Sequence, residues 1–219
     1  MSEVETMAAA KLDASVSKTW LRALELTASI PRNRDRILSS VIEELGARFG
    51  DAPALLSDRE SFTYRSLVAR SNQYARWALE QGLKKGDVVG LLMPNRPEYF
   101  ASWLGITSMG GVVALLNTNL VGASLAHCIN TVEPRHLIVD CDYVDRLSLS
   151  LQGIEGTPTI WVHGADHDGC SRIDRNIDQQ PTNSLSFNER PELSIEDRAL
   201  YIFTSGTTGL PKAANVSHA

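Results

Sequence analysis

The sequence predicts an α/β fold, with a mostly parallel, doubly wound sheet flanked by helices. Two observations carry this prediction. Short, continuous apolar runs recur along the chain, and runs without polar alternation are typical of strands covered on both faces. Segments with helical spacing separate these runs, so that strand–helix–strand units repeat, and such units form parallel sheets with right-handed connections. At 219 residues, the chain is long enough to bury one sizeable core.

Residues 1–36 are predicted to form an N-terminal helical extension. Val16, Trp20 and Leu24 lie near one face of a possible helix. We expect this helix to pack on the main body, because its polar face is not strongly basic. A helix that lies on a membrane surface is the alternative.

The next part of the chain predicts a helix, a hairpin and a longer helix. Helical spacing runs from Ile37 to Phe49, and the turn of the hairpin is expected at residues 57–60. The longer helix begins at Thr63 or Tyr64 and ends at Gly82. Its buried stripe is predicted to contain Leu67, Ser71, Ala75, Ala78 and Leu79.

The alternation of strand and helix starts after Gly82. The predicted strands are residues 88–93, 112–116, 136–140, 159–162 and 198–203. The helices between them include one that Asn95 is expected to cap together with Glu98, a second over 125–132 and a third over 143–151. In the second helix, His127 and Cys128 are expected to pack in the core. Residues 163–198 are polar and acidic with little periodicity, which predicts a surface segment.

Charge and hydropathy exclude two classes of protein. The net charge of −5 argues against a nucleic-acid-binding protein, which would carry a basic face. Residues 99–132 contain no Lys, Arg, Asp or Glu, and the first 18 of them reach the length of a transmembrane candidate. Gly110-Gly111 interrupts this stretch, so a buried helix followed by a buried strand explains it better.

Cysteine usage and the first residues predict a cytoplasmic protein. The three cysteines form no CxxC pair, which argues against a disulfide framework or a zinc site. The first residues lack the apolar core of a signal peptide. Peripheral contact with the inner face of a membrane stays open as an alternative. No metal ligand is assigned. Five residues of types that can bind metals lie close together in the sequence, but they lack the spacing of a known metal site and are predicted to form a surface loop: His163, Asp166, His167, Asp168 and Cys170.

The segment from Thr204 to Lys212 predicts a phosphate-binding loop. It follows an apolar strand, and open α/β sheets bind ligands at the carboxyl ends of their strands. Glycines let the backbone turn tightly and present N–H groups to an anion, hydroxyls add donors, and a lysine supplies positive charge. The predicted phosphate-binding residues are Thr204, Ser205, Gly206, Thr207, Thr208, Gly209 and Lys212. The markers of P-loop, dinucleotide, zinc-protease and serine-hydrolase enzymes are missing, and no catalytic residue is predicted.

The run from Leu200 to Lys212 resembles the phosphate-loop signature of the adenylate-forming, or AMP-binding, enzymes. Ala213-Ala214 after the lysine is similar to the branch of fatty-acid-transport proteins and very-long-chain acyl-CoA synthetases. The resemblance extends from about Leu38 to the end of the chain, and further matching blocks are residues 94–99, 103–105, 116–120 and 125–127. Val121 departs from the family, in which an arginine is common, so no role of that arginine is transferred.

The resemblance implies the N-terminal part of a long-chain fatty acyl-CoA synthetase, with ATP, Mg²⁺ and CoA as substrates or cofactor. The Thr204–Lys212 loop would hold the β- and γ-phosphates, with Mg²⁺ bridging them. Residues 37–219 would be the N-terminal portion of the AMP-binding domain, cut just after the phosphate loop. The missing C-terminal part would complete the active site, and the 219 residues alone are expected to be inactive. Two alternatives remain open: a non-catalytic truncated paralogue that binds a nucleotide, membrane or partner, and a phosphate-binding module for another nucleotide.

Overall fold

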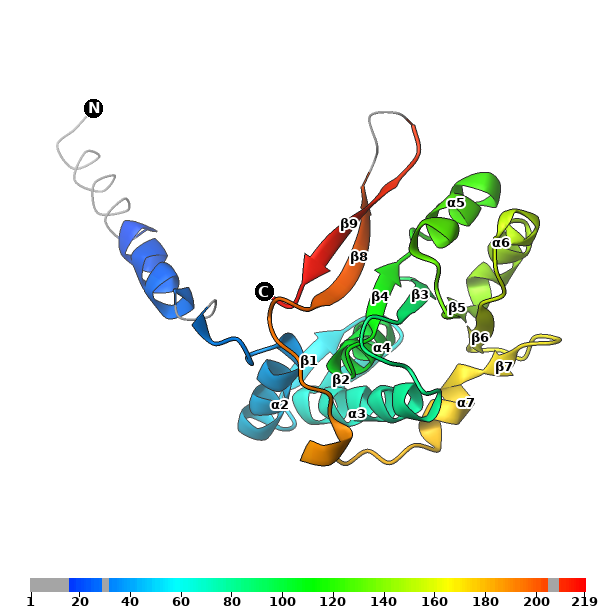
Figure 1. Cartoon of the computed structure of the whole chain (residues 1–219). Coiled ribbons are helices and arrows are strands. Elements are labelled where there is room, and N and C mark those ends of the chain that lie inside the picture. The colour runs from blue at the N-terminus through cyan, green and yellow to red at the C-terminus, as the bar shows by residue number, and fades with distance from the viewer. Residues whose placement is uncertain (1–15, 29–31, 205–208) are drawn as a thin grey trace, which may run out of the picture.

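A seven-stranded sheet forms the centre of the molecule (Figure 1). The computed structural model describes residues 16–28, 32–204 and 209–219. The strands are β3 (Val88–Leu92), β4 (Val112–Leu115), β5 (His136–Asp140), β6 (Thr159–His163), β7 (Ser171–Arg172), β8 (Arg198–Thr204) and β9 (Lys212–Ser217). Their order is β7-β6-β5-β3-β4-β8-β9, and only the last pair is antiparallel. The predicted mostly parallel sheet is therefore confirmed.

Helices cover both faces of this sheet, because neighbouring residues of each buried strand point to opposite sides. On one side, Leu91 and Ile138 pack with α3 (Tyr64–Glu80), α4 (Pro97–Ser108) and α7 (Ile173–Asp178). On the other, Leu92 and Val139 pack with α5 (Gly122–Val132) and α6 (Val144–Ser148). Short 3-10 turns follow β5, α6 and the segment after α7: η2 (Cys141–Tyr143), η3 (Leu151–Gly153) and η4 (Phe187–Glu189). The apolar runs thus bury both sides of the strands, as predicted.

A smaller layer packs outside α3 and α4. It consists of α2 (Leu38–Phe49) and the hairpin of β1 (Pro53–Leu56) and β2 (Ser61–Thr63), whose turn lies where the sequence predicts it. Thr63 begins α3 with a capping box to Ser66, as the predicted start requires. Gly105 of α4 lies directly against α3: a Cβ there would come within 2.3 Å of the Ser71 carbonyl oxygen. These two helices therefore pack backbone to backbone.

The start of α4 differs from the prediction. The N-cap is Arg96, no side chain caps the helix, and Pro97 is its first residue. Proline has no N–H to be capped and a fixed φ suited to this position. The Asn95 cap is therefore wrong, and Glu98 instead directs its carboxylate into the core, where it is 3% exposed.

The segment between β6 and β8 also differs in part. Residues 163–198 contain β7 and α7, and Ile173 and Ile177 of α7 are fully buried. These two isoleucines are one helical turn apart, a pattern too short to stand out in a polar segment. The buried stripe of α3 also differs at one position from the predicted one. Leu79 is 43% exposed, whereas Tyr74 and Trp77 are fully buried against the sheet.

The helix formed by residues 16–27 is exposed rather than packed. Trp20 is 66% exposed and Leu24 58%, so the expected packing on the main body is wrong. This helix lies apart from the packed body (Figure 1). In the described ranges, no helix is both long and apolar enough to cross a membrane. The stretch after Tyr99 is instead the body of α4 followed by β4, as predicted.

Candidate functional site

The predicted phosphate loop lies at the end of the β8–β9 hairpin (Figure 1). β8 ends at Thr204 and β9 begins at Lys212, and these two residues are paired directly opposite each other. Directly opposed residues of antiparallel strands place their side chains on one face, with Cβ atoms about 5 Å apart. Thr204 and Lys212 therefore flank the mouth of the connecting segment.

The groups at this mouth are open to solvent. Thr204, Gly209 and Lys212 are all exposed, and within the described ranges no carboxylate pairs with the Lys212 ammonium. Gly209 has a φ of +95°, a conformation that strains any residue with a Cβ. A lysine without a carboxylate partner, beside a hydroxyl and a glycine turn, can bind a phosphate oxygen without first breaking an ion pair.

Four of the predicted phosphate-binding residues, Ser205, Gly206, Thr207 and Thr208, lie outside the described residues. The geometry above therefore concerns Thr204, Gly209 and Lys212. The phosphate assignment of all seven residues stays a prediction.

His127 contacts the loop, which the sequence does not predict. It lies on α5, and its Nε2 is 3.1 Å from the carbonyl oxygen of Pro211. The neighbouring Cys128 is fully buried, as expected, whereas His127 is half-buried. His127 and Pro211 are separated by 84 positions in the sequence, so local periodicity gave no signal of their contact.

A second polar region lies where the sheet changes direction. From β3 the chain moves to β4 on one side and later to β5 on the other, so the loops after β3 and β5 lead to helices on opposite faces. Such a switch point leaves a crevice at the carboxyl ends of the strands. Here a cavity of about 310 Å³ is lined by the turn between β1 and β2, the loop after β3 and the start of η2.

Arg96 bridges the walls of this cavity. Its guanidinium donates two 2.8 Å hydrogen bonds to the Glu60 carboxylate and a 3.0 Å bond to Oδ2 of Asp140. Burial tends to raise the pKa of Glu60, but hydrogen bonds from Arg96 and the Glu98 backbone outweigh it, so the pKa is lowered. The arrangement thus ties the β1–β2 hairpin to the carboxyl end of β5.

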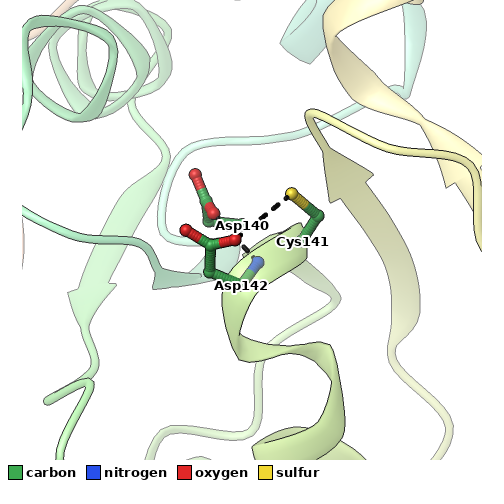
Figure 2. Close-up of side chains that lie close together, drawn as sticks. All are labelled: Asp140, Cys141 and Asp142. Atoms are coloured by element: carbon green, nitrogen blue, oxygen red, sulfur yellow. Dashed lines mark hydrogen bonds between the residues drawn. The ribbon is translucent and has the colours of Figure 1, made fainter. Parts of the chain in front are cut away.

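Asp140, Cys141 and Asp142 lie together at this edge (Figure 2). Asp140 Oδ1 accepts from the Asp142 backbone N–H at 3.1 Å, and the Cys141 thiol contacts Asp142 Oδ1 at 3.9 Å. Burial and the two carboxylates raise the pKa of the Cys141 thiol. A protonated thiol is a poor metal ligand, and the Arg96 cation already neutralises Asp140. These residues therefore have hydrogen-bond and ion-pair partners within the protein.

Buried ion pairs hold the neighbouring part of α4. Glu98 accepts two hydrogen bonds from Arg70 Nε, at 2.8 and 3.0 Å, and one from the Tyr74 hydroxyl at 2.7 Å. His163 ends β6 and is buried, so its predicted place in a surface loop is wrong, and its Nε2 lies 3.7 Å from Glu98 Oε1. Burial alone would raise the pKa of Glu98, but His163 and Arg70 outweigh it and the pKa is lowered. This cluster is enclosed in the core, so it supports the fold rather than a solvent-accessible site.

Comparison with models of protein families identifies the family of this chain. The sequence model described as "AMP-binding enzyme" matches residues 42–219. The chain belongs to this family. The resemblance of the Leu200–Lys212 run is therefore confirmed at the level of the family.

Relatives of this AMP-binding chain include fatty-acid proteins. It is 36% identical over 165 residues to the long-chain fatty acid transport protein 6 of Mus musculus, covering 74% of this chain and 27% of the relative. It is 31% identical over 187 residues to the medium/long-chain-fatty-acid–CoA ligase FadD6 of Mycobacterium tuberculosis, covering 85% and 30%. The chain thus spans less than a third of the length of these curated relatives.

Solved structures share the fold of this AMP-binding chain. The anthranilate CoA ligase AuaEII in complex with anthranoyl-AMP gives a TM-score of 0.77 at 24% identity, over 84% of this chain and 35% of the other. A Mycobacterium tuberculosis fatty acyl CoA synthetase gives 0.71 at 21% identity, over 83% and 34%. At these identities the match concerns the fold alone.

Proposed function

We propose that this AMP-binding chain is the N-terminal part of a fatty acyl-CoA ligase, which activates a long-chain fatty acid with ATP and transfers it to CoA. The observation that carries the proposal is the pairing of Thr204 with Lys212 at the mouth of a glycine-containing turn. The names of the relatives, a long-chain fatty acid transport protein and a medium/long-chain-fatty-acid–CoA ligase, support the fatty-acid substrate.

The proposed reaction has two steps. A carboxylate oxygen of the fatty acid bonds to the α-phosphorus of ATP while the bond to pyrophosphate breaks, which gives an acyl-adenylate. The CoA sulfur, after loss of its proton, then bonds to the acyl carbon, and AMP leaves. Negative charge builds up on the departing pyrophosphate in the first step only, so positive charge and N–H donors near the β- and γ-phosphates accelerate that step.

The seven residues of the loop have separate roles in this proposal. The Lys212 ammonium neutralises a phosphate oxygen, and Thr204 lies opposite it to donate from its hydroxyl. The remaining loop residues would add backbone N–H and hydroxyl donors: Ser205, Gly206, Thr207, Thr208 and Gly209. The described groups at the mouth are an ammonium and a hydroxyl, which fit phosphate rather than Mg²⁺, since Mg²⁺ prefers carboxylate and phosphate oxygens. No step is therefore assigned to Mg²⁺ through the described residues of this chain.

The domain division follows from the same proposal. Residues 37–219 would form the N-terminal portion of the AMP-binding domain, and residues 1–36 an extension. Further chain would complete the active site, as the length of the relatives supports.

The test is acyl-CoA synthesis by the chain expressed over its complete open reading frame. With ATP, Mg²⁺, CoA and palmitate, we expect pyrophosphate and palmitoyl-CoA in equal amounts. Lys212→Ala should lower the rate by about tenfold to several hundredfold, the effect of losing one charge-assisted contact. Lys84→Ala, which removes an exposed lysine in the loop before β3, is the matched control and should leave the rate unchanged. Pyrophosphate release that ignores fatty acids would contradict the proposal.

A second candidate function is peripheral membrane contact through the helix of residues 16–27. The observation that favours it is the exposure of its apolar side chains, including Trp20 at 66% and Leu26 at 68%. Such a helix binds a bilayer surface by burying its apolar face. A blue shift of Trp20 fluorescence with phosphatidylcholine–phosphatidylserine vesicles, lost in Leu21→Ser/Leu24→Ser, would support this role. The fluorescence of the other tryptophans is measured in Trp20→Ser and subtracted. Fluorescence that does not change with vesicles would exclude it.

A further inference from the structure

We infer that His127 is a positioning residue for the phosphate-binding segment, an inference that rests on the proposed function for its effect on phosphate. The imidazole of His127 holds the carbonyl of Pro211, at 3.1 Å from Nε2. Lys212 is the next residue and begins β9 opposite Thr204. His127 thereby fixes the peptide from which the proposed phosphate-binding lysine projects.

Among the described residues, 209–211 have few other restraints. Thr204, Leu210 and Lys212 are exposed, and Leu210 is 49% exposed. Within the described ranges, no other side chain forms a hydrogen bond with residues 209–212. Because the peptide group is planar, holding the Pro211 carbonyl also sets the direction of the Lys212 N–H. One hydrogen bond therefore limits the rotation of the backbone just before Lys212.

His127 lies on α5, a helix that is packed firmly against the sheet. Leu125, Cys128 and Ile129 of α5 are completely buried against the sheet. The backbone around His127 is also held by Thr131, whose hydroxyl donates to the His127 carbonyl at 2.7 Å. A side chain on a packed helix positions its partner more precisely than one on a loop. α5 thus connects the core to the residue that precedes β9.

Substitutions of His127 can show whether the hydrogen bond to Pro211 or only the packing of the side chain is important. A carbonyl oxygen only accepts, so the His127 Nε2 carries the hydrogen and donates. The neutral Nε2–H tautomer and the imidazolium both satisfy this. Glutamine can donate from a similar distance, whereas leucine fills space without a donor. If the hydrogen bond matters, His127→Gln preserves the function and His127→Leu does not; if only packing matters, the order reverses.

The experiment measures loop order and phosphate affinity separately, on the 219-residue chain. Amide hydrogen exchange over residues 209–213 reports the positioning of the segment. Titration calorimetry with ATP and with inorganic tripolyphosphate reports binding. We expect His127→Leu to speed exchange over these residues and to weaken both ligands about three- to tenfold, the effect of one lost hydrogen bond. His127→Gln should stay within about twofold of the unmodified chain in both measurements.

Three outcomes are decisive. Unchanged exchange and affinity in His127→Leu would overturn the inference, and so would equal losses in both variants. If the unmodified chain binds neither ATP nor tripolyphosphate, the proposed phosphate site is wrong, while the exchange data still decide whether His127 anchors Pro211. Should His127→Leu fail to fold, His127→Asn serves instead, because its shorter amide keeps a polar group but does not reach Pro211.

Discussion

At the scale of single residues, the chain uses its charges in two different settings. Lys212 is exposed and, within the described ranges, forms no ion pair, which suits a group that must bind and release an anion. Glu98 is 3% exposed and is held by Arg70, Tyr74 and the nearby His163. Burying a charge costs free energy unless its partners replace water, and removing one partner leaves the other uncompensated.

We expect Glu98→Gln to lower the free energy of unfolding by about 1–3 kcal/mol near neutral pH, because Arg70 loses its buried carboxylate partner and keeps only the exposed carboxylate of Asp178, 2.6 Å away. The pKa of Glu98 is lowered in the folded state from its ordinary value of 4.5. Its contribution to stability is therefore complete above that value and is lost as the pH falls through the folded-state pKa.

The measurement is urea denaturation between pH 3 and pH 7, monitored by tryptophan fluorescence. Below about pH 4.5, the free energy of unfolding should fall less steeply in Glu98→Gln than in the unmodified chain, because the variant has no carboxylate at position 98 to protonate. Glu44→Gln, at an exposed position in α2, is the control and should change stability by less than about 0.5 kcal/mol. Equal effects of the two substitutions would mean that the buried ion pair contributes nothing.

Residues with a local signature could be predicted from the sequence, and those with distant partners could not. The glycines and lysine of residues 204–212 form a continuous motif, so the sequence could place Gly209 and Lys212 in a connection after a strand, while their phosphate role stays a prediction. Glu98 was expected to cap a helix, because local spacing does not show that Arg70 lies beside it. His127 was assigned to the core for the same reason: its partner, Pro211, lies far along the chain.

At the scale of elements, the contact between α3 and α4 depends on the absence of a side chain at Gly105. A Cβ at this position would lie 2.3 Å from the Ser71 carbonyl oxygen and 2.5 Å from Tyr74 Cβ. We expect Gly105→Ala to destabilise the fold by about 1–3 kcal/mol, even though alanine favours helix, because the two backbones must move apart.

Thermal unfolding provides the measurement for this pair of helices. Gly153→Ala is the control, since a Cβ there meets only the Ala126 side chain, at 3.1 Å. Its melting temperature should stay within a few degrees of the unmodified chain, whereas Gly105→Ala should lower it by several degrees more. A Gly105→Ala protein as stable as the control would show that α3 and α4 can separate at no cost.

The sequence correctly predicted the elements that have long apolar runs or clear capping residues. The strands β3 to β6 and β8, and the capped start of α3, follow directly from hydropathy and from Thr63. Three elements were not predicted. β7 is two residues long, α7 is six residues long with only two buried isoleucines, and β9 has no buried residue, so none of them has the apolar periodicity on which such predictions depend.

At the scale of the whole molecule, the described chain contains part of the proposed phosphate site. The β8–β9 hairpin projects from the packed body, and Ile202 and Leu210 are 40% and 49% exposed (Figure 1). The described residues provide donors for phosphates but no assigned group that orients a carboxylate against the α-phosphorus. Such orientation supplies roughly 7–11 kcal/mol of a bimolecular barrier.

We therefore expect the 219-residue chain by itself to bind ATP without making acyl-CoA. The assay combines purified chain with ATP, Mg²⁺, CoA and palmitate, and follows pyrophosphate and thioester. Turnover above that of a Lys212→Ala control would mean that the chain already holds a complete active site.

The central claim is that Lys212 acts on the triphosphate, and the two half-reactions test it most directly. In the chain expressed over its complete reading frame, single-turnover kinetics would separate acyl-adenylate formation from thioester formation that starts from preformed acyl-adenylate. We expect Lys212→Ala to slow the first step by about tenfold to several hundredfold and the second step far less, because the pyrophosphate has then left. Equal losses in both steps would contradict the account and would assign Lys212 to folding.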